Sequence, residues 1–350
     1  MRAFNPLKNI FYFSLKYLLR FYNYIFFRNI KIYGYNNIPK DGGILFSPNH
    51  QGAFLDPLLI GSMTPKKITS LTRSDVFGGP LQWFLDALQM LPVYRIRNGY
   101  SNLKKNDAIF EKCFDLLGSG KFLLMFSEGG HHHEYYLKNL SKGSSRLAFQ
   151  AQRKYPKKKI YIQPVGINYG HHTQPRSSLH LVYGNPLLIS KFTDQKKSEA
   201  ENINLIREAL QLRMKDCLWI PEDSEIYNQQ KECINSVTTK MGFFQMKSAL
   251  KTKRKQLPKR KKRNNITKLL AGILSIPNII PIFITRKVVY KFKDPVFNSS
   301  MKYAMGVFLF PVYWILTAII INTMFGNSLM ALYLFVCLVF LFIRQHILLS

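Results

Sequence analysis

Residues 42–60 read GGILFSPNHQGAFLDPLLI, an apolar strand followed by a polar turn and a second apolar run. His50 follows the strand, and Asp56 opens the second run, where Pro57 suits the first turn of a helix. One interpretation is local: Asp56 caps that helix and His50 is an ordinary loop residue. The other is that Asp56 orients His50, whose imidazole takes a proton from a reacting group. Gly52 permits the tight turn that would bring the two side chains together.

Apolar strands alternate with helical patterns on both sides of this stretch, from about residue 31 to residue 190. The predicted strands are KIYGY, GGILFSP, KITSLT, QMLPVYRIR, KFLLMFSE, KIYIQPVGI and LHLVYG, with helical stretches such as 104–117 and 143–154 between them. This alternation predicts an α/β domain over residues 31–246, with a mostly parallel sheet flanked by helices. His50 would lie at the carboxyl edge of that sheet, where open α/β sheets place their ligands.

The composition suits an anionic partner. The chain has 350 residues, and its 50 Lys and Arg against 19 Asp and Glu give a formal charge of +31. Such an excess fits nucleic acid, an anionic bilayer or phosphorylated substrates. Four scattered cysteines without a C-x-x-C pair predict neither a disulfide framework nor a zinc knuckle. Residues 247–263 hold ten cations and no acid, and we expect a solvated basic linker over 247–265.

The N-terminal segment is apolar and aromatic. Residues 9–27 read NIFYFSLKYLLRFYNYIFF and form one polar stripe at near-helical spacing, made of Asn9, Lys16, Arg20 and Asn23. Because a spanning helix would bury two cations in lipid, we expect residues 1–30 to form an amphipathic helix in the bilayer interface. The alternative is a core-packing helix of a soluble domain.

Residues 266–350 are predicted to form a membrane region. Residues 304–325 and 329–347 are apolar enough to cross a bilayer as a hairpin. The stretch 269–285 is broken by two prolines, so we expect it to be re-entrant or interfacial. Cations flank the hairpin on both outer sides. By the positive-inside rule both ends, and the active site with them, face the cytoplasm.

Three further segments carry candidate binding residues. In FSEGGHHHEYYLKNLSKGSSR (126–146), backbone N–H groups of a strand-end loop could face an anion, and Lys142 and Arg146 share a helix face. Three consecutive histidines cannot all reach one metal from a regular element, so we predict no metal site in this loop. In PVYRIR (92–97), both arginines project from one strand face, where they bind phosphate or form a solvated edge. In IQPVGINYG, a strand stopped by Pro164 could line an apolar slot.

Taken in order, these segments resemble the motifs of the glycerolipid acyltransferase family, which includes the lysophosphatidate and glycerol-3-phosphate acyltransferases. NHQGAFLDP matches the family's Asn-His followed by an aspartate, PVYRIR its apolar strand with an arginine, FSEGG its FPEGTRS motif, and IQPVGI its apolar segment with a proline. The resemblance covers about residues 30 to 190. The histidine–aspartate spacing is one residue longer than the common H-x4-D. Ser127, Gly130 and His131 stand where the family places proline, threonine and arginine. The longer spacing and the EGG-H run look like the fungal glycerol-3-phosphate acyltransferases.

The resemblance implies that His50 is a general base and that Asp56 orients it. An acceptor hydroxyl would attack an acyl thioester, releasing coenzyme A or acyl carrier protein, and no metal or other cofactor is expected. The residues that it assigns to substrate binding are Asn49, Arg95, Arg97, Glu128, Gly129, Gly130, His131, Lys142, Pro164 and Val165, the last two at the acyl site. The expected acceptor is 1-acyl-glycerol-3-phosphate, which would give phosphatidate. The alternatives are glycerol 3-phosphate and another lysolipid or amino-lipid.

Two interpretations without catalysis compete with this one. A nucleic-acid-binding protein would explain the charge, but the basic residues lack a recognisable binding module and the apolar hairpin fits no such protein. We therefore expect an anionic membrane and no nucleic acid among the partners. A membrane scaffold that keeps the fold without activity is disfavoured by the intact His50 and Asp56.

Overall fold

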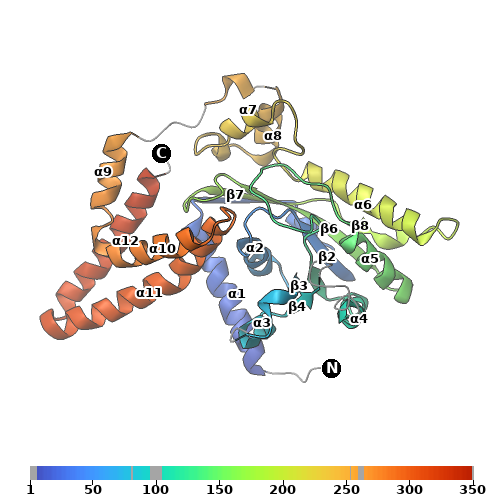
Figure 1. Cartoon of the computed structure of the whole chain (residues 1–350), viewed down its shortest axis with the longest axis horizontal. Helices are drawn as coiled ribbons and strands as arrows, with labels where there is room; N and C mark the ends of the chain where they lie inside the picture. The colour runs from blue at the N-terminus through green and yellow to red at the C-terminus, as the bar shows by residue number, and fades with distance from the viewer. Residues whose placement is uncertain (1–5, 80–81, 95–104, 253, 259–263, 349–350) are drawn as a thin grey trace.

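The computed structural model describes residues 6–79, 82–94, 105–252, 254–258 and 264–348. Within these residues an eight-stranded sheet has the order β1-β7-β6-β2-β5-β3-β4, and β8 pairs with β6 beside this path (Figure 1). The strands are β1 (Asn29–Tyr33), β2 (Gly43–Pro48), β3 (Ile68–Arg73), β4 (Met90–Val93), β5 (Phe122–Leu124), β6 (Ile160–Tyr169), β7 (Ser178–Tyr183) and β8 (Leu187–Leu188). Their pairings are parallel except those of β6 with β7 and β8, which confirms the mostly parallel α/β sheet.

Helices cover both faces of this sheet. They are α1 (Pro6–Phe26), α2 (Leu55–Met63), α4 (Lys105–Gly118), α5 (Gly143–Lys154) and α6 (Glu199–Asp216). Ile44 and Phe46 of β2 enter the apolar core shared with α1 and α2, whereas Leu45 enters the core shared with α4, α5 and α6. A parallel strand buried on both faces carries a continuous apolar run, which is the pattern of GGILF.

The remaining helices are α3 (Gln82–Ala87), α7 (Tyr227–Glu232), α8 (Phe243–Thr252), α9 (Asn265–Ile273), α10 (Ile279–Lys291), α11 (Phe297–Phe325) and α12 (Asn327–Ile347). The basic segment begins inside α8 rather than in a solvated linker. Met246 and Leu250 of α8 are buried in a third apolar cluster together with Trp219 and Phe243. Apolar residues spaced four apart on one helix face therefore keep residues 247–252 in the packed domain.

Two members of the polar stripe of α1, Lys16 and Asn23, are buried against the α/β domain, whereas Arg20 is exposed. Lys16 Nζ donates to the carbonyl oxygens of Thr64 at 2.8 Å and Lys66 at 3.0 Å, and Asn23 Nδ2 donates to Ser62 Oγ at 3.0 Å. The opposite face exposes large apolar side chains, namely Leu7, Ile10, Phe13, Tyr17, Leu18, Phe21, Tyr24 and Ile25. A contiguous exposed apolar stripe is typical of a helix that meets lipid, which favours the interfacial interpretation over the soluble one.

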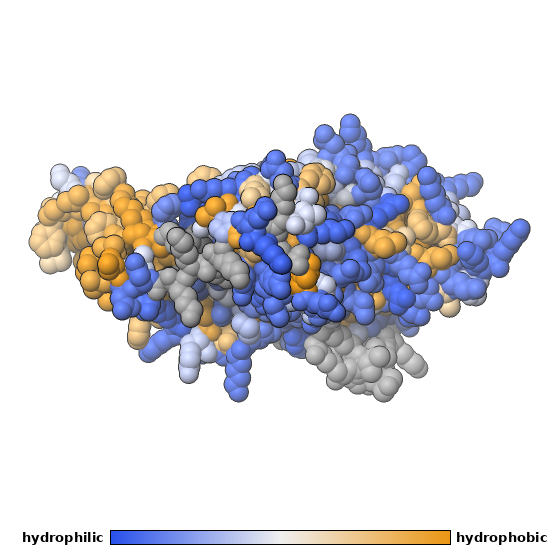
Figure 2. All heavy atoms as spheres, turned by 90° about the horizontal axis from the view of Figure 1, so that it is seen from above, coloured by the Kyte–Doolittle hydropathy of each residue, from blue (hydrophilic) through white to orange (hydrophobic). Residues whose placement is uncertain are grey.

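The C-terminal helices form an apolar extension at one end of the molecule (Figure 2). The helices α11 and α12 are long and apolar enough to cross a membrane, and they adjoin through Gly326 as the predicted hairpin. The helix α9 and the segment Ile276–Lys291, which contains α10, are bent by 61° at their junction. Such a bend occurs in a broken span as well as in a re-entrant segment, so the re-entrant or interfacial placement of 269–285 stays a prediction.

The strand β6 runs through Pro164 instead of stopping there. Pro164 is the parallel partner of Ser47 in β2. On its other edge, β6 pairs with β8 at Tyr161 and Ile162 and with β7 from Val165 onward. Pro164 falls between these two pairings, where a missing N–H breaks no ladder bond. Pro164 and Val165 are buried inside the sheet, so the expectation of a strand end at Pro164 is wrong.

Candidate functional site

The turn after β2 brings His50 and Asp56 into contact. We call residues 50–56 the His–Asp turn. His50 Nδ1 lies 2.8 Å from Asp56 Oδ2. Because a carboxylate only accepts hydrogen bonds, Nδ1 carries the hydrogen, and Nε2 is left to take a proton. The chain reverses at Ala53, whose φ of 45° lies in the left-handed region. The predicted contact is therefore present, at the carboxyl edge of the sheet.

Asp56 is fully buried and accepts hydrogen bonds on both carboxylate oxygens. Besides His50, Oδ2 accepts the backbone N–H of Gln51 at 2.9 Å and of Gly52 at 2.8 Å. Oδ1 accepts the hydroxyl of Tyr169 at 2.6 Å. Burial, together with the charge of Asp56, raises the pKa of Tyr169 well above its usual value, so the phenol remains a donor. Four hydrogen bonds thus fix the carboxylate with Oδ2 toward the imidazole.

Two expectations for this turn are corrected. Asp56 does not cap α2, because Phe54 occupies the N-cap position and Asp56 binds N–H groups that precede the helix. Gly52 is required for space rather than for a left-handed φ. A Cβ at Gly52 would lie 2.6 Å from Asp56 Oδ1 and 2.8 Å from the Tyr169 hydroxyl. The buried carboxylate and phenol therefore leave no room for a side chain.

The imidazole of His50 is held on its flat face as well as at Nδ1. It stacks on the ring of Phe126, with 3.8 Å between ring centroids and 17° between planes. His131 meets it edge-on at a centroid distance of 5.5 Å. The side chain remains 16% exposed. The ring of His50 is thus fixed in orientation and still accessible to solvent. A general base needs both properties to reach a substrate.

Glu128 joins the loop after β5 to the His–Asp turn. Its carboxylate accepts the backbone N–H of His50 at 2.7 Å, Nε2 of His132 at 2.6 Å and the backbone N–H of Lys138 at 3.0 Å. The side chain is fully buried. Gly129 follows with a φ of 73°, a conformation that favours glycine. Glu128 therefore braces two loops, and its role in positioning an acceptor stays a prediction.

The other residues of this loop point in different directions. His131 Nε2 donates to Asp294 Oδ2 at 2.9 Å, and burial lowers the pKa of His131. Lys142 is exposed just before α5, and Gly130 borders open space. Among the described residues, no three His, Cys, Asp or Glu side chains are arranged to hold a metal ion.

Asn49 directly follows β2 and hydrogen-bonds to β6. Its side chain donates to the Ile167 carbonyl at 3.1 Å and accepts the Ile167 N–H at 2.7 Å, so it extends the β2–β6 pairing by one step. The amide of Asn49 is thus hydrogen-bonded within this chain, and Asn49 is fully buried. Pro164 and Val165 are buried in the sheet. Substrate contact by these residues stays a prediction. Arg95 and Arg97 lie outside the described residues.

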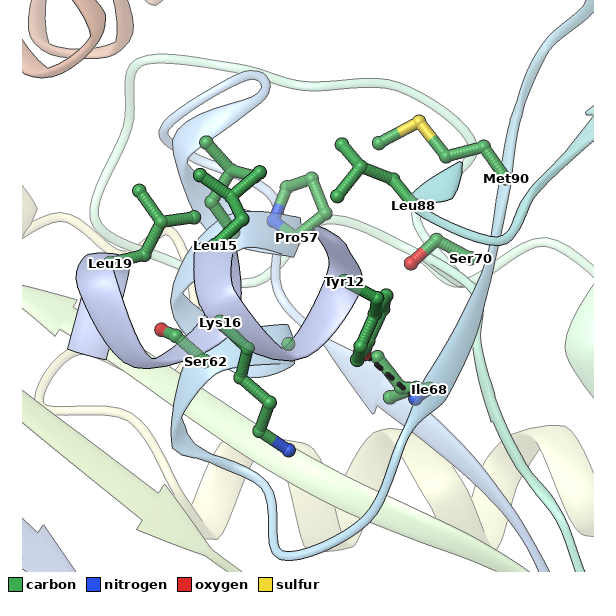
Figure 3. Close-up of a pocket in the computed structure, with 12 residues that line it drawn as sticks. Tyr12, Leu15, Lys16, Leu19, Pro57, Ser62, Ile68, Ser70, Leu88 and Met90 are labelled. Carbon is green, nitrogen blue, oxygen red and sulfur yellow. Dashed lines mark hydrogen bonds between the residues drawn. The ribbon is translucent and has the colours of Figure 1, made fainter. Parts of the chain in front are cut away.

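A small pocket opens between α1, α2 and β3 (Figure 3). It is lined by residues that include Leu15, Leu19, Pro57 and Met90. In its wall the backbone N–H of Ile68 donates to the Tyr12 hydroxyl oxygen at 3.0 Å. Its volume is about 40 Å³. A single water needs roughly 10–15 Å³ on this scale, so the pocket admits a few waters but no acyl chain.

Four residues of the site are not marked as functional by the sequence motifs. Phe126 lies inside the FSEGG motif but has no role assigned by it. Tyr169 follows the fourth motif closely but carries no local sign of a carboxylate partner. Asp294 and Ser300 belong to the C-terminal region, and Ser300 hydrogen-bonds to the His–Asp turn. Contacts across such chain separations have no signal in a single sequence.

Part of this chain is similar to known proteins. Residues 29–168 match the family model described as Acyltransferase. Two Saccharomyces cerevisiae proteins are similar: glycerol-3-phosphate O-acyltransferase 2 is 30% identical over 90 residues, and glycerol-3-phosphate O-acyltransferase 1 is 28% identical over 112 residues. The alignments cover 26% and 32% of this chain but only 12% and 15% of the yeast proteins.

A solved structure is also similar, that of the 1-acyl-sn-glycerophosphate acyltransferase PlsC from Thermotoga maritima. Its TM-score is 0.44 at 18% identity, and the match covers 62% of this chain and 83% of that one. The family match from 29 to 168 contains the whole His–Asp turn and the Glu128 loop. Residues 29–168 are thus similar to the Acyltransferase family, and part of the chain is similar to the yeast glycerol-3-phosphate acyltransferases.

Proposed function

We propose that this protein transfers a fatty acyl group from a thioester to the free hydroxyl of 1-acyl-glycerol-3-phosphate, giving phosphatidate. The observation that carries the proposal is the His50–Asp56 contact of 2.8 Å at the carboxyl edge of the sheet. A buried carboxylate and a partly exposed imidazole form a general base without a nucleophilic serine or cysteine.

In the proposed reaction His50 Nε2 takes the proton of the acceptor hydroxyl as its oxygen attacks the thioester carbonyl. The tetrahedral intermediate then collapses, the carbon–sulfur bond breaks, and the proton passes from His50 to the leaving thiolate. Asp56 stabilises the imidazolium that forms between these steps. A positioned general base contributes roughly 10²–10⁴ in rate. The thioester is already an activated acyl donor, so the proposed steps call for no cofactor.

The acceptor's phosphate needs cations near His50. We propose that Arg95 binds it, with Arg97, His131 and Lys142 as further phosphate contacts. An arginine fork pairs with phosphate oxygens through charge-assisted bonds. Arg95→Ala should therefore raise the KM for the acceptor and spare the KM for the acyl donor.

The apolar helices support a lipid acceptor. The exposed face of α1 and the apolar hairpin α11–α12 adjoin the domain that carries His50. A lysolipid held in that membrane would reach the site without leaving the bilayer. We further propose that the site faces the cytoplasm, because Lys291, Lys293 and Arg344 flank the hairpin on its outer sides.

Glycerol 3-phosphate is the second candidate acceptor. Both yeast relatives are named for it, and the six-residue step from His50 to Asp56 departs from the common H-x4-D spacing. Its product would be lysophosphatidate, formed by the same base and the same phosphate contacts.

An acceptor screen tests the proposal. Purified protein in mixed micelles receives labelled acyl-CoA or acyl-loaded carrier protein with 1-acyl-glycerol-3-phosphate, glycerol 3-phosphate or a lysolipid without a terminal phosphate monoester. We expect the highest kcat/KM with 1-acyl-glycerol-3-phosphate. A preference for glycerol 3-phosphate would select the second candidate. Equal use of an acceptor without that phosphate would contradict both.

A further inference from the structure

The first turns of α11 pack directly against the His–Asp turn. Ser300 is fully buried there. Its hydroxyl donates to the carbonyl oxygen of Gly52, and its Oγ accepts the backbone N–H of Leu55 at 3.0 Å. One side chain of the C-terminal region thus joins the two ends of the reversal at Ala53, 248 residues away from Gly52.

This reversal sets the geometry of the proposed base. A left-handed φ at a residue other than glycine costs energy and persists where its surroundings hold it. The backbone N–H groups of Gln51 and Gly52 bind the same Asp56 oxygen as His50 does. A shift of the Gly52 carbonyl therefore moves the donors that aim this oxygen at the imidazole.

The helix that carries Ser300 is fixed in rotation on the domain. Tyr303, three residues along, lies on the same face of α11 and is fully buried. Its hydroxyl donates to Asn23 Oδ1 at 2.6 Å, and its ring packs edge-on against Tyr22 and Phe26 of α1 at 5.0 Å. The contact between α11 and the turn is thus anchored by α1 (Figure 1).

The same end of the hairpin also reaches the neighbour of His50. Asp294, just before α11, accepts a hydrogen bond from His131, and Phe297 packs edge-on against the His131 ring at 5.2 Å. The His131 ring in turn contacts His50. Two separate contacts therefore connect the base of the hairpin to the site, although the family match ends at residue 168.

We propose that Ser300 is a positioning residue, through which the membrane hairpin completes the catalytic site. The inference rests on the proposed function, since it concerns the orientation of the His50–Asp56 pair during acyl transfer. Ser300 contacts neither substrate. It holds the Gly52–Leu55 turn so that Asp56 Oδ2 keeps its hydrogen bond to His50 Nδ1. Ser300 therefore affects kcat rather than substrate binding.

The test uses full-length protein and compares Ser300→Ala with Ser299→Ala. Ser299 is its buried neighbour, and the hydrogen bonds from α11 to the turn that the described residues show are those of Ser300. We expect Ser300→Ala to lower kcat about tenfold, the effect of one to two buried hydrogen bonds, with both KM values unchanged. Ser299→Ala should retain the wild-type kcat. Should Ser300→Ala not purify as a folded protein, Ser300→Cys replaces it, because a thiol is a weaker donor and acceptor of similar size.

A double variant separates positioning from general destabilisation. In an Asp56→Asn background, Ser300→Ala should lower kcat less than about twofold, because both changes act on the same imidazole. A second tenfold loss in that background would show an independent structural effect and overturn the inference. So would a wild-type kcat in Ser300→Ala. Wild-type protein that transfers no acyl group would overturn the proposed function itself, and this inference with it.

Discussion

Tyr169→Phe removes one hydroxyl from the buried carboxylate of Asp56. In the wild type that hydroxyl is the hydrogen-bond donor to Oδ1 at 2.6 Å, and the other three bonds reach Oδ2. A hydrogen bond to a charged group contributes roughly 1.5–3 kcal/mol. Both side chains are almost completely buried, so water cannot replace the donor. We therefore expect the free energy of unfolding to fall by about 1.5–3 kcal/mol.

The same bond orients the carboxylate toward His50, so its loss should also lower kcat. If the whole energy supports the transition state, kcat falls by about 10- to 100-fold, because each 1.4 kcal/mol is a factor of ten. Labelled acyl transfer and thermal unfolding in detergent measure the two effects. KM values should remain unchanged.

Tyr183→Phe is the matched control on the neighbouring strand β7. Tyr183 is buried like Tyr169, and among the described residues its hydroxyl has no hydrogen-bond partner. Its removal should leave both stability and kcat unchanged or slightly improve stability. Equal behaviour of the two variants would refute the role given to the Tyr169 hydroxyl.

Three further results are expected. Gly52→Ala should abolish activity because its Cβ would meet Asp56 and Tyr169, whereas Gly61→Ala in α2, with its nearest atom at 3.6 Å, should remain active; equal activities would contradict this explanation. Burial lowers the pKa of His180 to about 4, so the unfolded chain takes up a proton that the folded chain does not between pH 6.5 and 4. The free energy of unfolding should therefore decrease as the pH is lowered from 6.5 to 4. In His180→Phe the slope of this free energy against pH should be smaller, by the equivalent of up to one bound proton. An unchanged slope would refute the assignment. The fluorescence of a bimane label attached to Phe21→Cys should be quenched by nitroxide lipids in vesicles. The fluorescence of the same label on Glu208→Cys of α6 should not be quenched. If neither label were quenched, a lipid-facing α1 would be contradicted.

Local patterns predicted the parts of the fold that depend on local physics. Continuous apolar runs such as GGILF identified the buried strands, and the His50–Asp56 contact followed from a turn between a strand and a helix. The orientation of α1 was harder to predict. Lys16 and Asn23 of its polar stripe hydrogen-bond to the α/β domain, and the opposite, aromatic face is exposed.

The errors concern side chains whose partners are distant in sequence. Asp56 reads as a helix cap, but Tyr169 and the turn's own N–H groups occupy its oxygens. Pro164 reads as a strand end because its place between two edge pairings depends on β7 and β8. Ser300 has no motif at all. Its role follows only from how α11 docks on α1 and on the His–Asp turn.

The general-base role of His50 is tested most directly by the kcat of His50→Ala with labelled acyl-CoA and the preferred acceptor. The protein should remain folded and membrane-bound, because the His50 side chain is partly exposed and contributes little to the core. We predict a loss of about 10²–10⁴ in kcat. A kcat equal to that of the wild type would contradict the proposed mechanism.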